Sequence, residues 1–310
     1  MHSMPESAPR EVTPIGDRVG VIGLGAMGRP MTGHLLSRSG ARVGIHGRAR
    51  DRYTDLVAAG ATWHDTPRSV AAAADVVVLM LPDLPQVEEV LAGENGLLAA
   101  GPEDLLLVVS STSSPTEVRR LGERLVRETE GRVRVVDAPV SGGVDGAEDG
   151  TLSIMVGGTD ADARRAMAVL EACGRPYHLG PLGSGEVAKA CNQLIVSAAV
   201  LALGEAAVLA DRSGLELETL FQLFAGGYAD SRILRTRGGR MTTDDYSPSG
   251  PARYLLKDLD FATDVATATR TDTALLPALR AAFADLVTRG MGDSDMAVTK
   301  RYTEERSRRR

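Results

Sequence analysis

The stretch Arg18-Val-Gly-Val-Ile-Gly23-Leu-Gly25-Ala-Met-Gly28 decides which fold this chain is expected to adopt. It opens as a short apolar run, typical of a buried strand, and ends in three glycines with the spacing G-x-G-x-x-G. In a dinucleotide-binding βαβ unit the first glycine makes a tight turn and the second lets the backbone approach a pyrophosphate. The third lets helix and strand pack closely, and the helix N-terminus faces the phosphates.

The residues around this motif supply the context that a bare glycine pattern lacks. Helical spacing runs from Met27 to about Ser39 and stops at Gly40, and Arg42–His46 reads as the next strand. Glycines also mark ordinary turns, but here a strand precedes them and a helix follows, within a βαβ unit of about 30 residues. We therefore predict that a dinucleotide binds to Gly23, Leu24, Gly25, Ala26, Met27 and Gly28.

The end of the second predicted strand bears on the choice of cofactor. An acidic residue there would bind the ribose 2′-hydroxyl of NAD. This chain instead has His46-Gly-Arg48-Ala-Arg50, with no acid before Asp51. The alternative interpretation is a solvated loop that carries two arginines. The pattern favours NADP as cofactor, with NAD possible.

The pattern of elements changes near residue 180. Strands alternate with helices up to that point, which predicts an α/β Rossmann domain with a doubly wound, mostly parallel sheet over residues 18–180. From residue 186 onward the periodicity is helical and no convincing strand appears, so residues 181–310 are predicted to form an all-α domain. Residues 1–17 are polar and Pro-rich, and we interpret them as a disordered leader rather than a signal peptide.

Composition excludes several classes of function. The net charge is −6 and the only basic run is the tail 306–310, so nucleic acid is not an expected partner. Cys173 and Cys191 belong to no CxxC pair, which gives no metal site and no disulfide framework to predict. The longest apolar stretch, Leu194 to Leu203, is shorter than the roughly 20 residues that span a bilayer. We expect a cytoplasmic protein that does not bind membranes.

A candidate for proton transfer lies in the segment Gly183–Gln193. Lys189, Asn192 and Gln193 are at positions i, i+3 and i+4, so they share one face of a helix that is otherwise apolar. The chain has only three lysines and otherwise uses arginine, although three lysines could persist by chance. Such a lysine either extends to solvent or acts as an acid/base, for which partial burial and a neighbouring amide are suited.

A second polar segment, Asp137-Ala-Pro-Val-Ser141-Gly142-Gly143, follows a predicted strand. Its two glycines allow backbone N–H groups to approach a ligand closely, and Ser141 adds a hydroxyl. That combination suits a substrate carboxylate. Taken alone, a glycine-rich turn would be the favoured interpretation.

Four motifs in this order resemble the β-hydroxyacid dehydrogenases, which include 3-hydroxyisobutyrate dehydrogenase and 2-hydroxy-3-oxopropionate (tartronate semialdehyde) reductase. The resemblance covers about residues 18–300. It is carried by Val21–Met31, by Asp137–Gly143 continuing to Gly158, by Gly183–Gln193 and by Lys257-Asp258-Leu259. It implies a long interdomain helix that carries Lys189, and a homodimer or homotetramer.

The resemblance also implies an activity and roles for single residues. The activity is reversible hydride transfer between NADP(H) and a small β-hydroxy acid or its semialdehyde. Lys189 would be the general acid/base, Asn192 a substrate-positioning amide with Gln193 beside it, and Ser141, Gly142 and Gly143 the carboxylate clamp. Further cofactor contacts would come from Leu81, Pro82, Thr112 and Lys257. No metal is required.

Three rival functions fit the same fold. An imine reductase usually lacks the helix lysine, and a non-catalytic NADP-binding module has no need of it, so Lys189 argues against both. Oxidative decarboxylation of 6-phosphogluconate comes with a longer helical domain than this chain can supply.

Overall fold

The computed structural model describes residues 18–308, so the leader expected at residues 1–17 lies outside the described part. Two compact units make up the chain, one ending at Glu186 and the other beginning at Val187. Helix α8 (Ser184–Arg212) begins in the first unit and continues into the second. The change of sequence pattern predicts a boundary between residues 180 and 181, and the division observed falls in the first turn of α8.

The first unit is built on a nine-stranded sheet in the order β3-β2-β1-β4-β5-β6-β8-β7, with β9 paired to β8. Strands β1 to β6 pair in parallel, β8 runs antiparallel to β6 and β7, and β9 is parallel to β8. The order reverses between β2-β1 and β1-β4, which confirms the doubly wound, mostly parallel sheet. The strands are β1 (Arg18–Ile22), β2 (Arg42–His46), β3 (Thr62–Trp63), β4 (Val76–Leu79), β5 (Leu105–Val109), β6 (Val133–Asp137), β7 (Val140–Ser141), β8 (Leu152–Gly157) and β9 (Gly174–Gly180).

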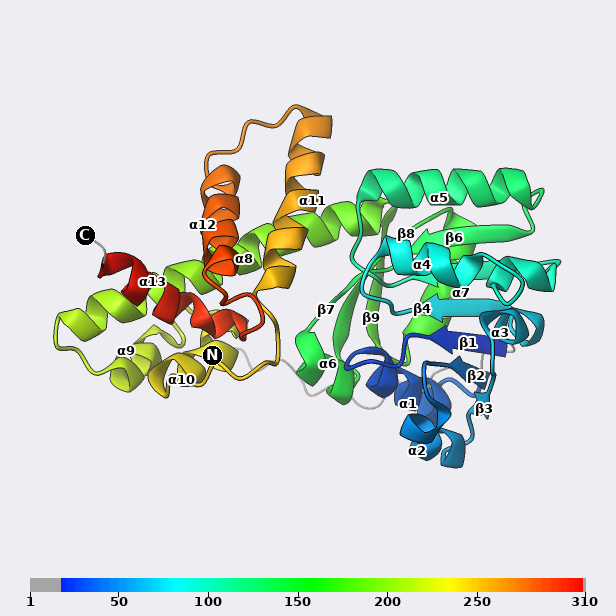
Figure 1. Ribbon diagram of the computed structural model, residues 1–310, viewed down its shortest axis with the longest axis horizontal. Helices are drawn as coiled ribbons and strands as arrows, with labels where there is room; N and C mark the ends of the chain where they lie inside the picture. Colours follow the sequence, from blue (N-terminus) through cyan, green and yellow to red (C-terminus); the bar gives the residue numbers. More distant parts are fainter. Residues whose placement is uncertain (1–17, 309–310) are drawn as a thin grey trace. The chain divides into compact units, whose positions relative to one another are not determined.

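Helices cover both faces of this sheet (Figure 1). Successive side chains of β5 alternate between two cores, as a strand buried on both faces requires. Leu106 and Val108 pack in the core that includes Met31 of α1, whereas Leu105 and Leu107 pack in the core formed with α3, α4 and α5. The helices are α1 (Gly28–Arg38), α2 (Thr54–Ala58), α3 (Pro67–Ala73), α4 (Leu84–Leu91), α5 (Pro115–Glu128), α6 (Gly143–Asp149) and α7 (Asp160–Leu170), with short 3-10 helices η1 (Arg50–Tyr53) and η2 (Leu97–Ala100).

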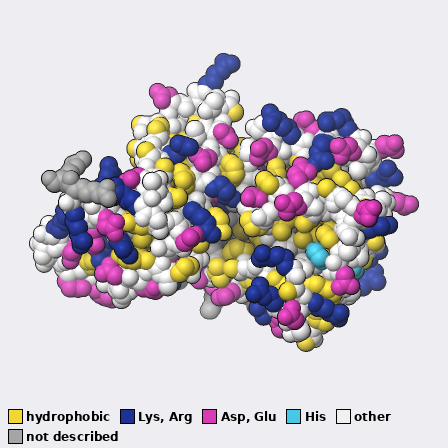
Figure 2. All heavy atoms as spheres, viewed as in Figure 1, with side chains coloured by type: hydrophobic (Ala, Val, Ile, Leu, Met, Phe, Trp, Pro, Cys, Tyr) yellow, Lys and Arg dark blue, Asp and Glu magenta, His cyan; other side chains and the backbone are white. Residues whose placement is uncertain are grey.

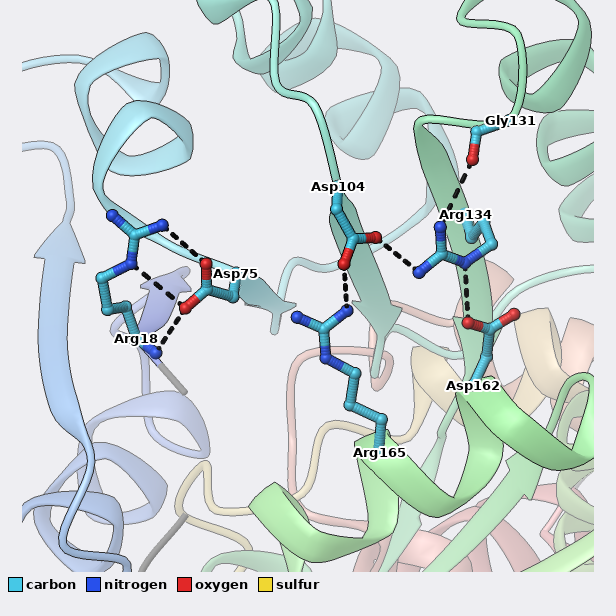
Figure 3. Close-up of polar contacts among 7 residues, drawn as sticks. All are labelled: Arg18, Asp75, Asp104, Gly131, Arg134, Asp162 and Arg165. Atoms are coloured by element: carbon cyan, nitrogen blue, oxygen red, sulfur yellow. Dashed lines mark hydrogen bonds and ion pairs between the residues drawn. The ribbon is translucent and has the colours of Figure 1, made fainter. Parts of the chain in front are cut away.

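Two separate groups of ion pairs lie at the amino ends of the central strands (Figure 3). Arg18, the first residue of β1, pairs with Asp75 just before β4, and Arg134 of β6 bridges Asp104 and Asp162 at 2.6 and 2.8 Å. Because the strands are parallel, this edge lies opposite the glycine-rich loop that follows β1. These ion pairs therefore join neighbouring strands on the side of the sheet away from the predicted cofactor site.

The second unit is helical throughout its described residues, apart from an isolated bridge between Pro251 and Asp295, as predicted. Its core joins α8, through Val200 and Ala207, to α11 and α12, through Leu259 and Phe283. The remaining helices are α9 (Leu217–Phe224), α10 (Arg232–Thr242), α11 (Arg253–Thr269), α12 (Leu276–Thr288) and α13 (Thr299–Ser307), with the 3-10 helix η3 (Met296–Val298).

Helix α8 alone, among the described helices, is long and apolar enough to cross a bilayer by length and composition. The apolar stretch that we expected to end at Leu203 is longer by this criterion, because the few polar residues leave an 18-residue apolar window. Core helices of proteins that never enter a membrane meet the same criterion, and 39% of this window is buried. The buried residues of α8, among them Val200 and Ala207, pack in the core of the second unit.

Acidic and basic side chains are intermixed over the face drawn in Figure 2. This distribution agrees with the ordinary charge balance of the sequence.

Candidate active site

The loop after β1 needs glycine at two positions for reasons of packing. Gly23 has a φ of +99°, and a Cβ built there would lie 2.2 Å from the carbonyl oxygen of Met80. A Cβ at Gly28 would lie 1.9 Å from the carbonyl oxygen of Gly23. Gly25 differs, because it is exposed and a Cβ there would meet nothing within 4 Å. The space over Gly25 is therefore open to a ligand that approaches the backbone.

The N-terminus of α1 adds a second feature that fits a pyrophosphate. Met27, at the N-cap position, makes no side-chain hydrogen bond to the first turn, and that turn contains no acidic residue. The partial positive charge of a helix N-terminus is then available to an anion. The residues present fit a dinucleotide, as predicted from the sequence.

The other predicted cofactor residues of the first unit follow the carboxyl ends of neighbouring strands, whereas Lys257 lies on α11 in the second unit. Leu81 and Pro82 follow β4, Thr112 follows β5 and Arg48 follows β2. The backbone N–H of Leu81 donates to Oγ of Ser111 at 3.2 Å, which joins two of these loops. The site of the strand-order reversal, at the carboxyl ends of the strands, is where sheets of this type bind ligands.

Arg48 is exposed and makes no hydrogen bond or ion pair to another described residue. Its guanidinium is therefore not already committed to an acidic side chain of the first unit.

The segment Ser141-Gly142-Gly143 leads from β7 into α6, a helix that the sequence pattern did not predict. Gly142 and Gly143 have φ values of +140° and +67°, a region of backbone conformation that favours glycine. The same two glycines gave the segment the sequence pattern of a turn. A Cβ at Gly143 would meet nothing within 4 Å. The backbone there is open to close approach, which is compatible with the predicted carboxylate clamp.

In the second unit, Lys189 is 8% exposed on α8, and an amide chain lies beside it. Nδ2 of Asn192 donates to Oε1 of Gln193 at 2.8 Å, and Nε2 of Gln193 donates to Oδ2 of Asp258 at 2.6 Å. Asp258 is on α11, next to Lys257. The structure thus brings together the face of α8 and the Lys257-Asp258 motif, two predicted segments that are far apart in the sequence.

Asp258 is a functional candidate for which the sequence predicts no role, although it belongs to the motif Lys257-Asp258-Leu259. It is 5% exposed, and its Oδ1 has no hydrogen-bond partner among the described residues. Burial raises the pKa of Asp258, and the charges of Lys189 and Lys257 together with the Gln193 hydrogen bond act to lower it. The only signal in the sequence was an acid directly after a lysine in a helical segment.

Lys257 lies over two aromatic rings of its own helix. Its Nζ is 5.6 Å from the ring centroid of Phe261 and 6.0 Å from that of Tyr254. Cation–π contacts at these distances stabilise the ammonium beside the two rings.

Asp137 and Glu186 are two further buried acids for which the sequence predicts no role. Both lie in segments already quoted, Asp137 at the end of β6 and Glu186 in the first turn of α8. The signal that could have identified them is a charged residue in an otherwise apolar setting.

These features define a class of protein. An enzyme with a glycine-rich dinucleotide site at the switch point of a parallel sheet, and with a buried lysine on the helix that follows the last strand of the sheet, is an NAD(P)-dependent oxidoreductase. Comparison with known families agrees. Residues 18–188 match the NAD binding domain of 6-phosphogluconate dehydrogenase. Residues 183–302 match the family described as NAD-binding of NADP-dependent 3-hydroxyisobutyrate dehydrogenase.

Individual relatives narrow the class. The chain is 40% identical to the 2-hydroxy-3-oxopropionate reductase of Escherichia coli K12, over 81% of this chain and 85% of the relative. It is 33% identical to an NAD-dependent L-serine dehydrogenase of Pseudomonas aeruginosa, over 92% and 97%. A structure of Mycobacterium tuberculosis 3-hydroxyisobutyrate dehydrogenase with L-serine superimposes with a TM-score of 0.78 at 30% identity, covering 93% and 99%. The chain belongs to the β-hydroxyacid dehydrogenase family and is an NAD(P)-dependent hydroxyacid dehydrogenase.

Proposed function

We propose that the enzyme catalyses reversible hydride transfer between NADP(H) and a small β-hydroxy acid or its semialdehyde, of the 3-hydroxyisobutyrate or tartronate semialdehyde type. The observation that carries this proposal is the buried Lys189 beside the hydrogen-bonded chain from Asn192 through Gln193 to Asp258. The name of the 40% identical relative, a 2-hydroxy-3-oxopropionate reductase, supports the semialdehyde class.

Each side chain has one part in this reaction. The nicotinamide, when bound, supplies or accepts the hydride at the substrate carbon. Nζ of Lys189 donates a proton to the carbonyl oxygen during reduction and takes it back during oxidation. Backbone N–H groups at Gly142 and Gly143, with the hydroxyl of Ser141, bind the substrate carboxylate, and Asn192 orients the reacting oxygen. Asp258 holds Gln193 in place through the 2.6 Å hydrogen bond.

A substrate panel tests this proposal. Three- and four-carbon hydroxy acids and semialdehydes, L-serine, 6-phosphogluconate and a cyclic imine are each assayed with both cofactors by nicotinamide absorbance. Turnover of a hydroxy acid or semialdehyde is the expected result. Reduction of the imine alone would establish the rival reductase, and cofactor binding without any turnover would indicate a non-catalytic module.

Arg48 is proposed to select NADP(H) by binding its 2′-phosphate. Charge-assisted hydrogen bonds contribute about 1.5–3 kcal/mol, so Arg48→Asp should weaken NADPH binding roughly 10- to 100-fold and leave NADH nearly unchanged. Arg42→Asp is the matched control, because Arg42 is an exposed arginine at the other end of the same strand. Fluorescence titration gives the Kd of each cofactor. Equal affinity of the native enzyme for NADPH and NADH would contradict this role.

We also propose that the enzyme is a cytoplasmic homodimer or homotetramer, assembled through an exposed apolar stripe on α8. The stripe consists of Cys191, Ile195, Ala202 and Leu209, which recur at intervals of four and seven residues and therefore share one helix face. Ile195 and Leu209 are each 69% exposed. Exposed apolar side chains aligned in this way are typical of helices that pack against a partner.

Ile195→Glu is expected to shift the enzyme toward the monomer, because a second copy would have to bury the new charge. Analytical ultracentrifugation over a range of protein concentrations measures the shift. Val126→Glu is the control, since Val126 is an apolar residue of α5 that is 45% exposed and lies outside the stripe. If Ile195→Glu leaves the sedimentation coefficient of an oligomer unchanged, this stripe is not the interface.

A further inference from the structure

Two buried carboxylates hold the first turn of α8. Asp137, at the end of β6, is fully buried, and Glu186 is 1% exposed. Oδ1 of Asp137 accepts from the backbone N–H of Gly183, and its Oδ2 accepts from the backbone N–H of Glu186, both at 2.7 Å. Oε2 and Oε1 of Glu186 accept from the backbone N–H and the hydroxyl of Ser113, both at 3.0 Å. All four oxygens therefore have donors.

Close packing reinforces these bonds. A Cβ at Gly185 would lie 2.1 Å from the carbonyl oxygen of Met155, and one at Gly157 would lie 2.3 Å from Oδ1 of Asp137. The start of α8 is thus pressed against β8 and β6 with no room for a side chain. The first turn can neither rotate nor shift along its axis without breaking a buried hydrogen bond or causing a clash.

Burying two carboxyl groups has a free-energy cost that a structural cap does not require. Burial raises the pKa of Asp137 to about 6, although the hydrogen bonds from the backbone N–H groups of Gly183 and Glu186 act to lower it. A neutral Ser or Thr would cap a helix without placing two acids in the interior. A carboxylate, however, accepts on both oxygens at once, so it fixes two donors in one geometry.

We infer that Asp137 and Glu186 are positioning residues, which fix the rotation of the first turn of α8 and through it the direction of Lys189. Lys189 follows Glu186 by three residues, about one turn, on the same helix. The rotation of the first turn therefore sets where Nζ of Lys189 points. This inference rests on the proposed role of Lys189 as the acid/base.

The test compares Glu186→Gln and Asp137→Asn with Asp75→Asn. Each amide replaces one acceptor oxygen with a donor, so one buried N–H or O–H faces another donor. We expect kcat to fall about 10- to 100-fold in the first two variants, the loss typical of a catalytic group displaced by about 1 Å. The Kd for NADPH should change less than kcat, because the glycine loop is untouched and only Ser113, next to the proposed cofactor contact Thr112, loses a hydrogen bond.

Asp75→Asn is the matched control. Asp75 also accepts from a backbone N–H, that of Arg18 at 2.9 Å, but it lies at the amino edge of the sheet (Figure 3). Its loss should lower Tm and leave kcat unchanged at temperatures well below Tm. Native kcat in folded Glu186→Gln and Asp137→Asn would overturn the inference. Should Asp137→Asn fail to fold, Glu186→Gln and Ser113→Ala, the latter keeping the backbone donor, still decide it.

A double variant separates positioning from general destabilisation. If Glu186 acts through Lys189, adding Glu186→Gln to Lys189→Ala should leave the residual kcat of Lys189→Ala unchanged. A further loss of similar size would show that Glu186 does not act through Lys189. Native turnover by Lys189→Ala itself would instead refute the proposed function, so the two failures are distinguishable.

Discussion

Lys189→Ala is expected to fold, bind NADP(H) and lose turnover by about 10²–10⁴-fold, the range for a missing general acid/base. Lys189 is 8% exposed, and its charge acts to lower the pKa of the nearby Asp258 carboxyl, which burial raises. Lys189→Arg should recover little of the activity, because a guanidinium stays protonated over the working pH range and cannot exchange a proton with the substrate oxygen. A purely electrostatic role predicts the opposite, with arginine restoring much of the rate.

The decisive measurements are kcat and the cofactor Kd of the wild type and both variants, on the substrate that the panel identifies. Lys300→Ala is the matched control, since Lys300 is a lysine that is 6% exposed, in α13, paired with Asp244 at 2.8 Å. Its loss should reduce stability without changing kcat in the folded enzyme. Near-native kcat in either Lys189 variant would assign proton transfer to another group.

Gly25→Val is expected to leave the fold intact and to weaken NADP(H) binding about 100-fold or more. The backbone at Gly25 does not have a positive φ, and a Cβ would meet nothing within 4 Å, so the free protein can accommodate the side chain. The valine would occupy the space proposed for the pyrophosphate and remove at least two charge-assisted hydrogen bonds, each contributing about 1.5–3 kcal/mol.

Gly33→Val, in helix α1 directly after the glycine loop, provides the comparison. A Cβ at Gly33 also meets nothing within 4 Å, and valine has a helix propensity no worse than glycine. Isothermal titration with NADPH and thermal unfolding distinguish the outcomes: Gly33→Val should bind normally, and Gly25→Val should bind poorly at an unchanged Tm. Normal binding by both variants would show that the cofactor does not approach Gly25.

Much of the fold could be predicted because its signals are local. The apolar runs of β1 and β4 and the helical periodicity of α8 each lie within one segment of chain. Helix α6 was missed, since its seven residues Gly143–Asp149 begin at a glycine pair and contain two of the glycines that mark turns. Strands β3 and β7 were also missed, because two-residue strands have no periodicity to detect.

In the candidate site, too, residues with a local sequence signal could be predicted and residues that depend on distant contacts could not. Gly23, Gly25 and Gly28 could be proposed as cofactor contacts from their spacing, and Lys189 as the acid/base from its position on an apolar helix face beside Asn192. The role of Asp258 could not, because its hydrogen-bond partner Gln193 is 65 residues away along the chain. No pattern within a single segment indicates which distant amide a buried acid will contact.

The sequence by itself determined the class of each segment, the glycine loop for a dinucleotide and the helix face that carries Lys189. These depend on backbone periodicity and steric freedom, which act over a few residues. Only the tertiary structure decided that Asp137 accepts from Gly183, 46 residues later, and that Glu186 accepts from Ser113, 73 residues earlier. A buried carboxylate needs donors wherever packing supplies them, so its partners are set by how strands and helices meet in space and not by their order in the chain.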